Sequence, residues 1–386
     1  MNPRNRVFAV MAASFVLLGM PMAAMGVAWP SAAEDLGRTL ADLGLITFAY
    51  GAGYTVSTLA SGELTRRFST GPLLVAAASA AAASLAVFAI SSTWIPFLVA
   101  GFMVGLAGGL LDAGVNAYVA VHRGPRAMGI IHTGFGIGST IGPLLVALII
   151  SLGWSWRIAF GAFAVAELML AIAFVATVSA IDSNELENGA RPSVGNNGLV
   201  LALSLTVFFL YAGVAAGTGA WSYSLLTEGR GFSTAVAGVA VAAYWGGVTA
   251  GRAALGVFGN RVEPNRVLTM SAVGTVASLL LLWIAPTPWL GIVGLIASGL
   301  SHGFVFPLEV LLTPRRFGAG FAPWAVGYEI AAANVGVAVV SGTIGLLVGR
   351  WGIFIVAPAL VVVALALWAA IETLRVQSAL RSAAPA

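Results

Sequence analysis

Long apolar segments separated by short polar breaks make up nearly the whole chain. Each is long enough for a helix that crosses the hydrocarbon core of a membrane, which takes about 20 residues. The hydropathy pattern predicts twelve such spans. In the first half of the chain they run over 6–33, 40–65, 71–92, 94–121, 126–151 and 155–180. In the second half they run over 198–226, 233–258, 265–285, 288–313, 322–349 and 352–376.

One long polar segment interrupts this pattern. Residues 181–197, IDSNELENGARPSVGNN, contain proline, glycine, asparagine and charge without an apolar period, which is typical of a linker. We therefore predict an N-terminal six-helix bundle over residues 1–180, a cytoplasmic linker over 181–197 and a C-terminal six-helix bundle over 198–386.

The two halves also repeat each other in sequence. The segment YGAGYT at 50–55 in span 2 matches YWGGVT at 244–249 in span 8. At the same offset, Gly-Leu at 105–106 in span 4 matches Gly-Leu at 299–300 in span 10. Internal repeats of this kind are common in transporters. The predicted fold is an all-α membrane protein with twelve transmembrane helices in two pseudo-symmetric six-helix bundles.

Composition supports a membrane protein and excludes several classes of function. Of the 386 residues, 59% are hydrophobic and 8% are charged, against about 25% charged residues in soluble domains. The lack of cysteine excludes disulfides, thiolate metal sites and thiol nucleophiles. Because the sequence has no P-loop, zinc-ligand spacing or Ser/His/Asp pattern, we expect neither an enzyme nor an ATP-driven pump. We expect no cofactor and no metal, with H⁺ as the coupling ion and Na⁺ as the alternative.

Charge placement predicts the orientation in the membrane. All 18 basic residues are arginines, and most fall in loops on one side of the predicted spans. Short cytoplasmic loops carry such an excess, so we predict that both termini are cytoplasmic. The apolar run after Arg6 is longer than the roughly 7–15 residues of a signal peptide, which predicts an uncleaved first span. We expect a monomer in the bacterial inner membrane, in contact with lipid and without a nucleic-acid partner.

Asp112 lies in the middle of span 4, where a charge costs about 2.5–3.5 kcal/mol even on the lenient insertion scale. Such residues face the interior of a bundle or a water-filled path. Asn116 follows four residues later, on the same face of a helix. We interpret Asp112 as the proton-coupling group and Asn116 as a contact to substrate hydroxyls. For both, a structural hydrogen bond to a neighbouring helix is the alternative.

Spans 5 and 10 add further candidates. His132 titrates near neutral pH and could relay protons or bind substrate, or lie at the cytoplasmic end instead. In span 10, His302, Phe306 and Glu309 share one face of a helix. We predict that His302 and Phe306 contact substrate and that Glu309 assists proton coupling. The alternative for Glu309 is an ion pair with Arg316 or with the arginine before it.

Spans 11 and 8 contain polar residues whose role depends on whether the side chain faces the cavity. Glu329 and Asn334 are five residues apart, about 140° around a helix, so we expect one of them to face the cavity. We assign that place to Glu329, as a further proton-coupling group, and keep Asn334 among the substrate-binding candidates. Arg252 in span 8 is interpreted as reaching the cytoplasmic surface.

Aromatic side chains could stack against a sugar ring. The candidates are Tyr211 and Trp221 in span 7, Tyr244 in span 8, Tyr50 in span 2 and Trp29 in span 1. The alternative is an anchor at the membrane interface, which is the usual place for tryptophan and tyrosine near span ends.

The twelve spans, the linker and the two parallel repeats resemble the major facilitator superfamily. Its loop signature after span 2 corresponds to GELTRRFSTG at 62–71, where Arg66 occupies the acidic position, as Asn260 does in the second copy. The resemblance implies the major facilitator fold and alternating access. It also implies that span 6 is peripheral, so Glu167 is expected to have a packing or lipid-edge role.

Within the superfamily, the chain resembles the fucose permease-like sugar symporters and the sodium-dependent glucose transporters. Asp112-Ala-Gly-Val-Asn116 is similar to their span-4 pattern, and His132-Thr133 stands where they have Gln-Thr. Residues 211–221 resemble their span-7 motif, but its glutamate is replaced by Ala215. Span 1 also lacks the second acidic residue of the fucose permease.

Three functions are open at this point. The favoured one is a secondary active transporter that works by alternating access, as a proton-coupled symporter of a neutral polar solute such as a sugar. The second is proton-antiporting efflux of hydrophobic or drug-like compounds, which the sparse intramembrane charge permits. The third is a transport-inactive sensor or scaffold on the same fold.

Overall fold

The structure is a computed structural model that describes residues 3–122, 125–177, 181, 198–258, 263–285, 287–318 and 321–383. The predicted linker falls almost wholly outside these ranges, so the domain limits 1–180, 181–197 and 198–386 stay predictions. Asn260 lies outside them too, and the side chain of Arg66 is not described.

Helices account for nearly all of the described chain. The first half contains α1 (Pro3–Asp35), α2 (Leu43–Phe68), α3 (Thr70–Ile90), α4 (Trp94–His122), α5 (Pro125–Ser151) and α6 (Arg157–Val175). The second half contains α7 (Gly198–Ser224), α8 (Thr234–Phe258), α9 (Pro264–Ile284), α10 (Pro288–Gly303), α11 (Val305–Phe317), α12 (Ala322–Trp351) and α13 (Val356–Ala383). Together they form 12 apolar helices of membrane-spanning length, which confirms the predicted all-α membrane fold.

Helices α10 and α11 form one span with a break at Phe304. Pro307 explains the break, because proline has no N–H and leaves the carbonyl of Gly303, four residues earlier, without its helical partner. Such interruptions are tolerated at membrane depth where the freed backbone is buried in protein. The break lets α11 take a direction of its own beside α12 and α9.

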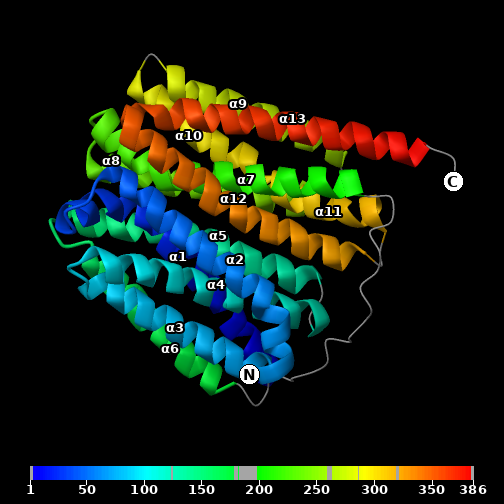
Figure 1. Cartoon of the computed structure of the whole chain (residues 1–386), viewed down its shortest axis with the longest axis horizontal. Coiled ribbons are helices and arrows are strands. Elements are labelled where there is room, and N and C mark those ends of the chain that lie inside the picture. The colour runs from blue at the N-terminus through cyan, green and yellow to red at the C-terminus, as the bar shows by residue number, and fades with distance from the viewer. Residues whose placement is uncertain are drawn as a thin grey trace.

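The helices form two groups, α1 to α6 and α7 to α13, which occupy the lower and upper parts of Figure 1. Helix pairs repeat between the groups: α1 packs on α5 as α7 packs on α12, and α2 packs on α4 as α8 packs on α10. In the same way, α3 packs on α6 and α9 on α13. The internal repeat predicted from sequence is therefore a repeat of helix packing.

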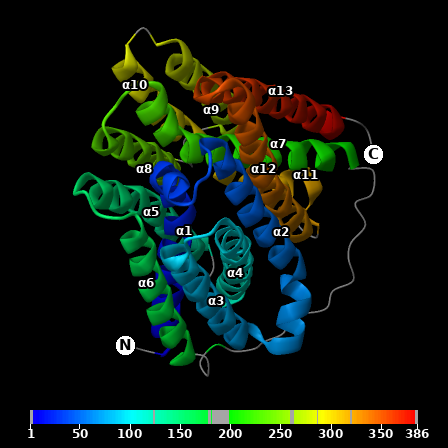
Figure 2. The same cartoon turned by 60° about the vertical axis from the view of Figure 1, so that its left-hand side comes forward.

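The two groups meet along α5 and α8, α2 and α12, and α1 and α7 (Figure 2). They pack tightly at the face where α2 begins and α12 ends. A Cβ added to Gly345 of α12 would lie 2.8 Å from the Cα of Gly44 in α2, and one added to Gly26 of α1 would lie 2.4 Å from the carbonyl oxygen of Ala220 in α7. Glycine at these positions lets the helix backbones touch, which closes the interface on this face.

The closed face is braced by polar contacts around the end of α1. Trp29 Nε1 donates a hydrogen bond of 3.0 Å to the carbonyl of Leu40, and Trp156 Nε1 donates one of 3.0 Å to Asp35. Arg157 pairs with the same aspartate at 3.3 Å. These contacts fix the loop between α1 and α2, and with it the start of α2 beside α12.

Candidate functional site

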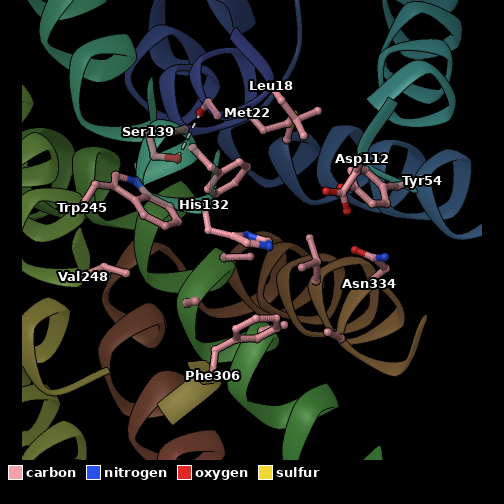
Figure 3. Close-up of a pocket in the computed structure, with 18 of the residues that line it drawn as sticks. Leu18, Met22, Tyr54, Asp112, His132, Ser139, Trp245, Val248, Phe306 and Asn334 are labelled. Atoms are coloured by element: carbon pink, nitrogen blue, oxygen red, sulfur yellow. Dashed lines mark hydrogen bonds between the residues drawn. The ribbon is translucent and has the colours of Figure 1, made fainter. Parts of the chain in front are cut away.

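A cavity of about 250 Å³ lies at the centre of the molecule between the two helix groups; we call it the central cavity. Both groups contribute to its wall, as Figure 3 shows for a subset of the residues. It is lined by Phe15, Leu18, Gly19, Met22, Ala23, Thr47, Tyr50, Tyr54, Asp112, Asn116, His132, Phe135, Ser139, Tyr211, Ala212, Ala215, Ala216, Ala220, Trp245, Val248, Arg252, Phe306, Ile330, Ala333, Asn334 and Val337.

Asp112 of α4 faces this cavity together with Asn116, as the sequence predicts. Asn116 Nδ2 donates a hydrogen bond of 2.8 Å to Asp112 Oδ1. Tyr54 of α2 is a second hydrogen-bond partner of the carboxyl group, and the two side chains lie next to each other in Figure 3. Asp112 is therefore a carboxyl group within a membrane-spanning helix. Two hydrogen-bond partners hold it in place, and it faces the central cavity.

His132 of α5 also lies in the cavity wall rather than at the cytoplasmic end of its helix. Its ring makes an edge contact with Phe15 of α1, with the ring centres 5.4 Å apart. On the opposite side, 6.5 Å away, is the ring of Phe306. His132 and Phe306 come from different helix groups, so this contact bridges the two halves across the cavity (Figure 3).

Arg252 of α8 corrects the sequence interpretation, because it lines the cavity instead of reaching the cytoplasmic surface. Its Nη2 lies 3.3 Å from the hydroxyl oxygen of Tyr211, to which it donates, and its guanidinium lies over the Phe306 ring at 5.9 Å. His302 stands behind Tyr211: the rings stack 4.3 Å apart, and Nε2 donates to the Tyr211 carbonyl at 2.9 Å. His302 thus supports Tyr211 and does not line the cavity.

On α12 the prediction chose the wrong residue. Asn334 lines the cavity, and its Nδ2 atom is buried with no partner among the described residues. Glu329 is fully buried on another face, where it accepts a hydrogen bond of 2.5 Å from Ser204 and one of 3.0 Å from Thr313. The angle of about 140° between the two positions is as expected. The hydroxyl groups of Ser204 on α7 and Thr313 on α11 bind Glu329, so Asn334 is the one of the two that faces the cavity.

Glu309 of α11 forms the ion pair with Arg316 that the sequence left open as the alternative to proton coupling. It is 1% exposed, does not line the central cavity, and forms an ion pair with Arg316, which is itself 6% exposed. Its second carboxylate oxygen has no partner within the described ranges. The pair links two positions seven residues apart, about two turns, along α11.

We predict that Arg316→Leu destabilises the protein, because it leaves the Glu309 carboxylate buried without a counterion. Breaking a buried pair by removing one partner costs about 3–5 kcal/mol, whereas replacing both partners with apolar residues is often neutral. Thermal unfolding in detergent measures this. The double variant with Glu309→Leu should recover most of the loss, and an equal loss in the double variant would contradict the ion-pair assignment.

Trp221 and Tyr244 do not reach the central cavity in this conformation, contrary to the prediction that they bind substrate. Both are almost fully buried in the hydrophobic core. The Tyr244 hydroxyl donates a hydrogen bond of 3.1 Å to the carbonyl of Ala215, a cavity residue, so Tyr244 packs one layer behind the wall. Its sequence neighbour Trp245 lines the cavity instead, so the prediction for α8 missed by one residue.

Tyr50, one of the aromatic candidates, lines the cavity wall, and so does Tyr54, for which no role was predicted. The two residues are four apart on α2, and their rings are 5.7 Å apart. The same i, i+4 rule that identified Asn116 from Asp112 would have found Tyr54 from Tyr50. Among the described residues, no three His, Cys, Asp or Glu side chains gather to hold a metal ion.

A second and larger space, about 940 Å³, adjoins the central cavity; we call it the open cleft. It lies between α1 and α5 on one side and α8 and α11 on the other, toward the end of the molecule where α1 begins. His132, Arg252 and Phe306 line both spaces. The central cavity and the open cleft therefore share part of their wall, while the packing at Gly44 and Gly345 closes the interface between the two helix groups at the end of the molecule where α2 begins.

Comparisons with known proteins agree with this architecture. The chain is 22% identical over 347 residues to the glucose/mannose transporter GlcP of Bacillus subtilis (strain 168), covering 86% of each chain. It is 23% identical over 396 residues to the sodium-dependent glucose transporter 1 of Homo sapiens, covering 89% of this chain and 73% of that one.

Solved structures share the fold at low sequence identity. The crystal structure of the nucleoside transporter NupG superposes with a TM-score of 0.72 at 15% identity, covering 97% of this chain and 99% of that one. FucP, a transporter in its outward conformation, gives a TM-score of 0.63 at 16% identity, covering 95% and 98%. The family model of the Major Facilitator Superfamily matches residues 11–322. This chain is a membrane transporter and not an enzyme, and it belongs to the Major Facilitator Superfamily.

Proposed function

We propose that the protein is a proton-coupled sugar symporter. The observation that carries the proposal is the place of Asp112, a carboxyl group held by Asn116 and Tyr54 in a cavity that both helix groups build. Around it the wall offers amide, hydroxyl, imidazole and guanidinium groups for sugar hydroxyls and aromatic rings for the sugar face. Two relatives, matched over 86% and 73% of their own lengths, are named as transporters of glucose or of glucose and mannose, which supports sugars as the substrate class.

Cavity size separates the sugar proposal from drug efflux. Pockets for drug-sized ligands measure about 300–1,000 Å³. The central cavity, at about 250 Å³, suits a single ring better than a larger amphipathic compound. The apolar side chains of Phe15, Leu18, Met22 and Val248 keep efflux of a small hydrophobic compound as the second candidate.

The proposed mechanism is alternating access, in which the two helix groups rock about the central cavity. The open cleft supplies the route to one face, and separation of Gly44 from Gly345 would supply the route to the other. With both termini in the cytoplasm of a bacterium, as arginine placement predicts, the open cleft faces inward. The transporter works as a monomer in the inner membrane, since one chain builds the whole pathway.

Protons are favoured over sodium as the coupling ion. Asn116 presents its NH₂ group to Asp112, and Tyr54 is the other partner of the carboxyl group, so no cage of oxygen acceptors surrounds it among the described residues. An amide N–H donor cannot ligate Na⁺, whereas a carboxyl group in a cavity wall can take up and release a proton.

Solute-driven proton movement in liposomes tests the proposed function. Addition of a sugar outside vesicles that contain the purified protein should alkalinise the outer medium, with no requirement for sodium. Acidification on addition of a hydrophobic cation would support the efflux candidate instead. No ion or solute flux with any sugar or cation tested would contradict both and favour a transport-inactive sensor.

We predict that Asn334→Leu weakens sugar binding, because the Asn334 side chain lines the central cavity and its amide can hydrogen-bond a sugar hydroxyl. Loss of one hydrogen bond costs about 0.5–1.5 kcal/mol, which corresponds to a roughly two- to tenfold higher Kd. Titration calorimetry on the purified protein measures the change. Tyr328→Phe, a change on the same helix outside the cavity wall, is the control and should leave the Kd unchanged.

A further inference from the structure

A small pocket of about 20 Å³ lies inside the first helix group, beside the central cavity. We call it the Glu167 pocket, after the acid of α6 that lines it together with residues of α1, α2, α3 and α4. Glu167 is 4% exposed, and its Oε2 atom is buried without a hydrogen-bond partner in the described part of the chain. Of the two expected roles, packing or a lipid-edge position, the structure fits packing, because the side chain points into the bundle.

The surroundings of Glu167 require a protonated acid. From α1, α3 and α4 the pocket is lined by leucine, methionine, alanine, valine, glycine and proline, and from α2 by Tyr50, the one other titratable group in its wall. No arginine or histidine belongs to this wall. An ionised carboxylate without a counterion in such surroundings is far more costly than its neutral form. The neutral acid carries an O–H that needs an acceptor.

A proline in α1 supplies that acceptor. Pro21 lines the pocket and has no N–H, so the carbonyl of Leu17, four residues earlier and also in the pocket wall, lacks its helical donor. One water molecule fits the pocket, since a site needs about 10–15 Å³ and two to four polar partners. The Glu167 carboxyl and the Leu17 carbonyl provide two, and Tyr50 lines the pocket from α2. The pocket does not suit a metal cation, because it offers fewer oxygen ligands than the roughly six to eight that Ca²⁺ takes.

Tyr50 connects this pocket to the transport pathway. Its side chain lines both the Glu167 pocket and the central cavity, and its ring lies beside Tyr54, a hydrogen-bond partner of Asp112. Leu18 and Met22 also line both spaces, and their side chains are apolar. We propose that Glu167, one water molecule and the Tyr50 hydroxyl form a buried proton-binding site that exchanges its proton with the central cavity.

Infrared spectroscopy of the full-length protein in lipid tests the site without any transported solute, so it can fail independently of the proposed function. We expect a carbonyl band of a hydrogen-bonded carboxylic acid that is lost in Glu167→Gln and kept in Glu329→Gln, the same change at another buried position. Glu167→Asp should shift the band, which gives a second assignment if the glutamine variant does not fold. In D₂O the band should exchange at least tenfold more slowly in Tyr50→Phe than in the unmodified protein.

Three results would overturn the proposal. A spectrum unchanged by Glu167→Gln would mean that the acid is ionised. A band at the frequency of an acid without hydrogen bonds would mean that the pocket is dry. Equal exchange rates in Tyr50→Phe and the unmodified protein would mean that the proton does not leave through Tyr50.

Discussion

Asp112→Asn is expected to abolish uphill sugar transport while sugar exchange continues. Asparagine keeps the size of the side chain and its place beside Asn116 and Tyr54, but it cannot take up and release a proton. A pH difference of one unit is worth about 1.4 kcal/mol per proton, enough for roughly tenfold accumulation at one proton per sugar. In liposomes with such a gradient, the unmodified protein should approach this ratio and the variant should stop near one.

Exchange of labelled for unlabelled sugar across the same vesicles separates loss of coupling from loss of folding. It needs the alternating movement and the binding site but no net proton transfer, so the variant should retain it. Glu372→Gln, the same carboxyl-to-amide change at a partly exposed acid of α13 outside the cavity wall, is the matched control and should still accumulate sugar. Accumulation by Asp112→Asn above the equilibrium ratio would show that another group carries the proton.

The sequence predicts the fold well because the membrane restricts what a chain can do. Backbone groups in lipid must be satisfied within a segment, so apolar length alone identifies helices. The repeat then pairs spans: glycine at 105 in α4 and at 299 in α10 fits against the backbone of Tyr50 and Tyr244, respectively. These glycines are visible in sequence because close packing of helix backbones leaves few alternatives.

The site is predicted less completely, for reasons that differ between residues. Asp112 and Asn116 are found because an acid in mid-membrane must face a polar space. The same rule predicted that Glu329 faces the cavity. Instead, the hydroxyl groups of Ser204 and Thr313, which belong to other helices, donate hydrogen bonds to Glu329 at a place away from the cavity. Local periodicity cannot foresee such partners.

Arg252 shows a related limit of sequence-based reasoning. A long cation near a helix end is expected to reach the membrane surface. Here the Tyr211 hydroxyl and the Phe306 ring hold it in the cavity wall instead. Both partners belong to other helices, and the side-chain direction follows from how α7, α8 and α11 pack.

Gly345→Val is expected to shift the protein toward a state that is open at the face where α2 begins. A Cβ at this position would lie 2.7 Å from the carbonyl oxygen of Ala41 and 2.8 Å from the Cα of Gly44. Both contacts are with backbone, which cannot rotate away as a side chain could. Overpacking of this kind costs about 1–3 kcal/mol, and the cost falls on the closed arrangement because separated helices accommodate the valine. The population of the closed state should drop by roughly five- to 150-fold.

The lack of cysteine makes this shift directly measurable, since one introduced thiol is the sole target of a thiol reagent. Thr47 lines the central cavity on α2, one turn beyond Gly44, and is 2% exposed. In a Thr47→Cys background, a membrane-impermeant maleimide added from the closed face should react slowly, and Gly345→Val should accelerate the reaction. Gly327→Val, the same change on the same helix at a position where a Cβ meets nothing within 4 Å, should not. Equal labelling in both valine variants would mean that the contact between α2 and α12 does not close the pathway.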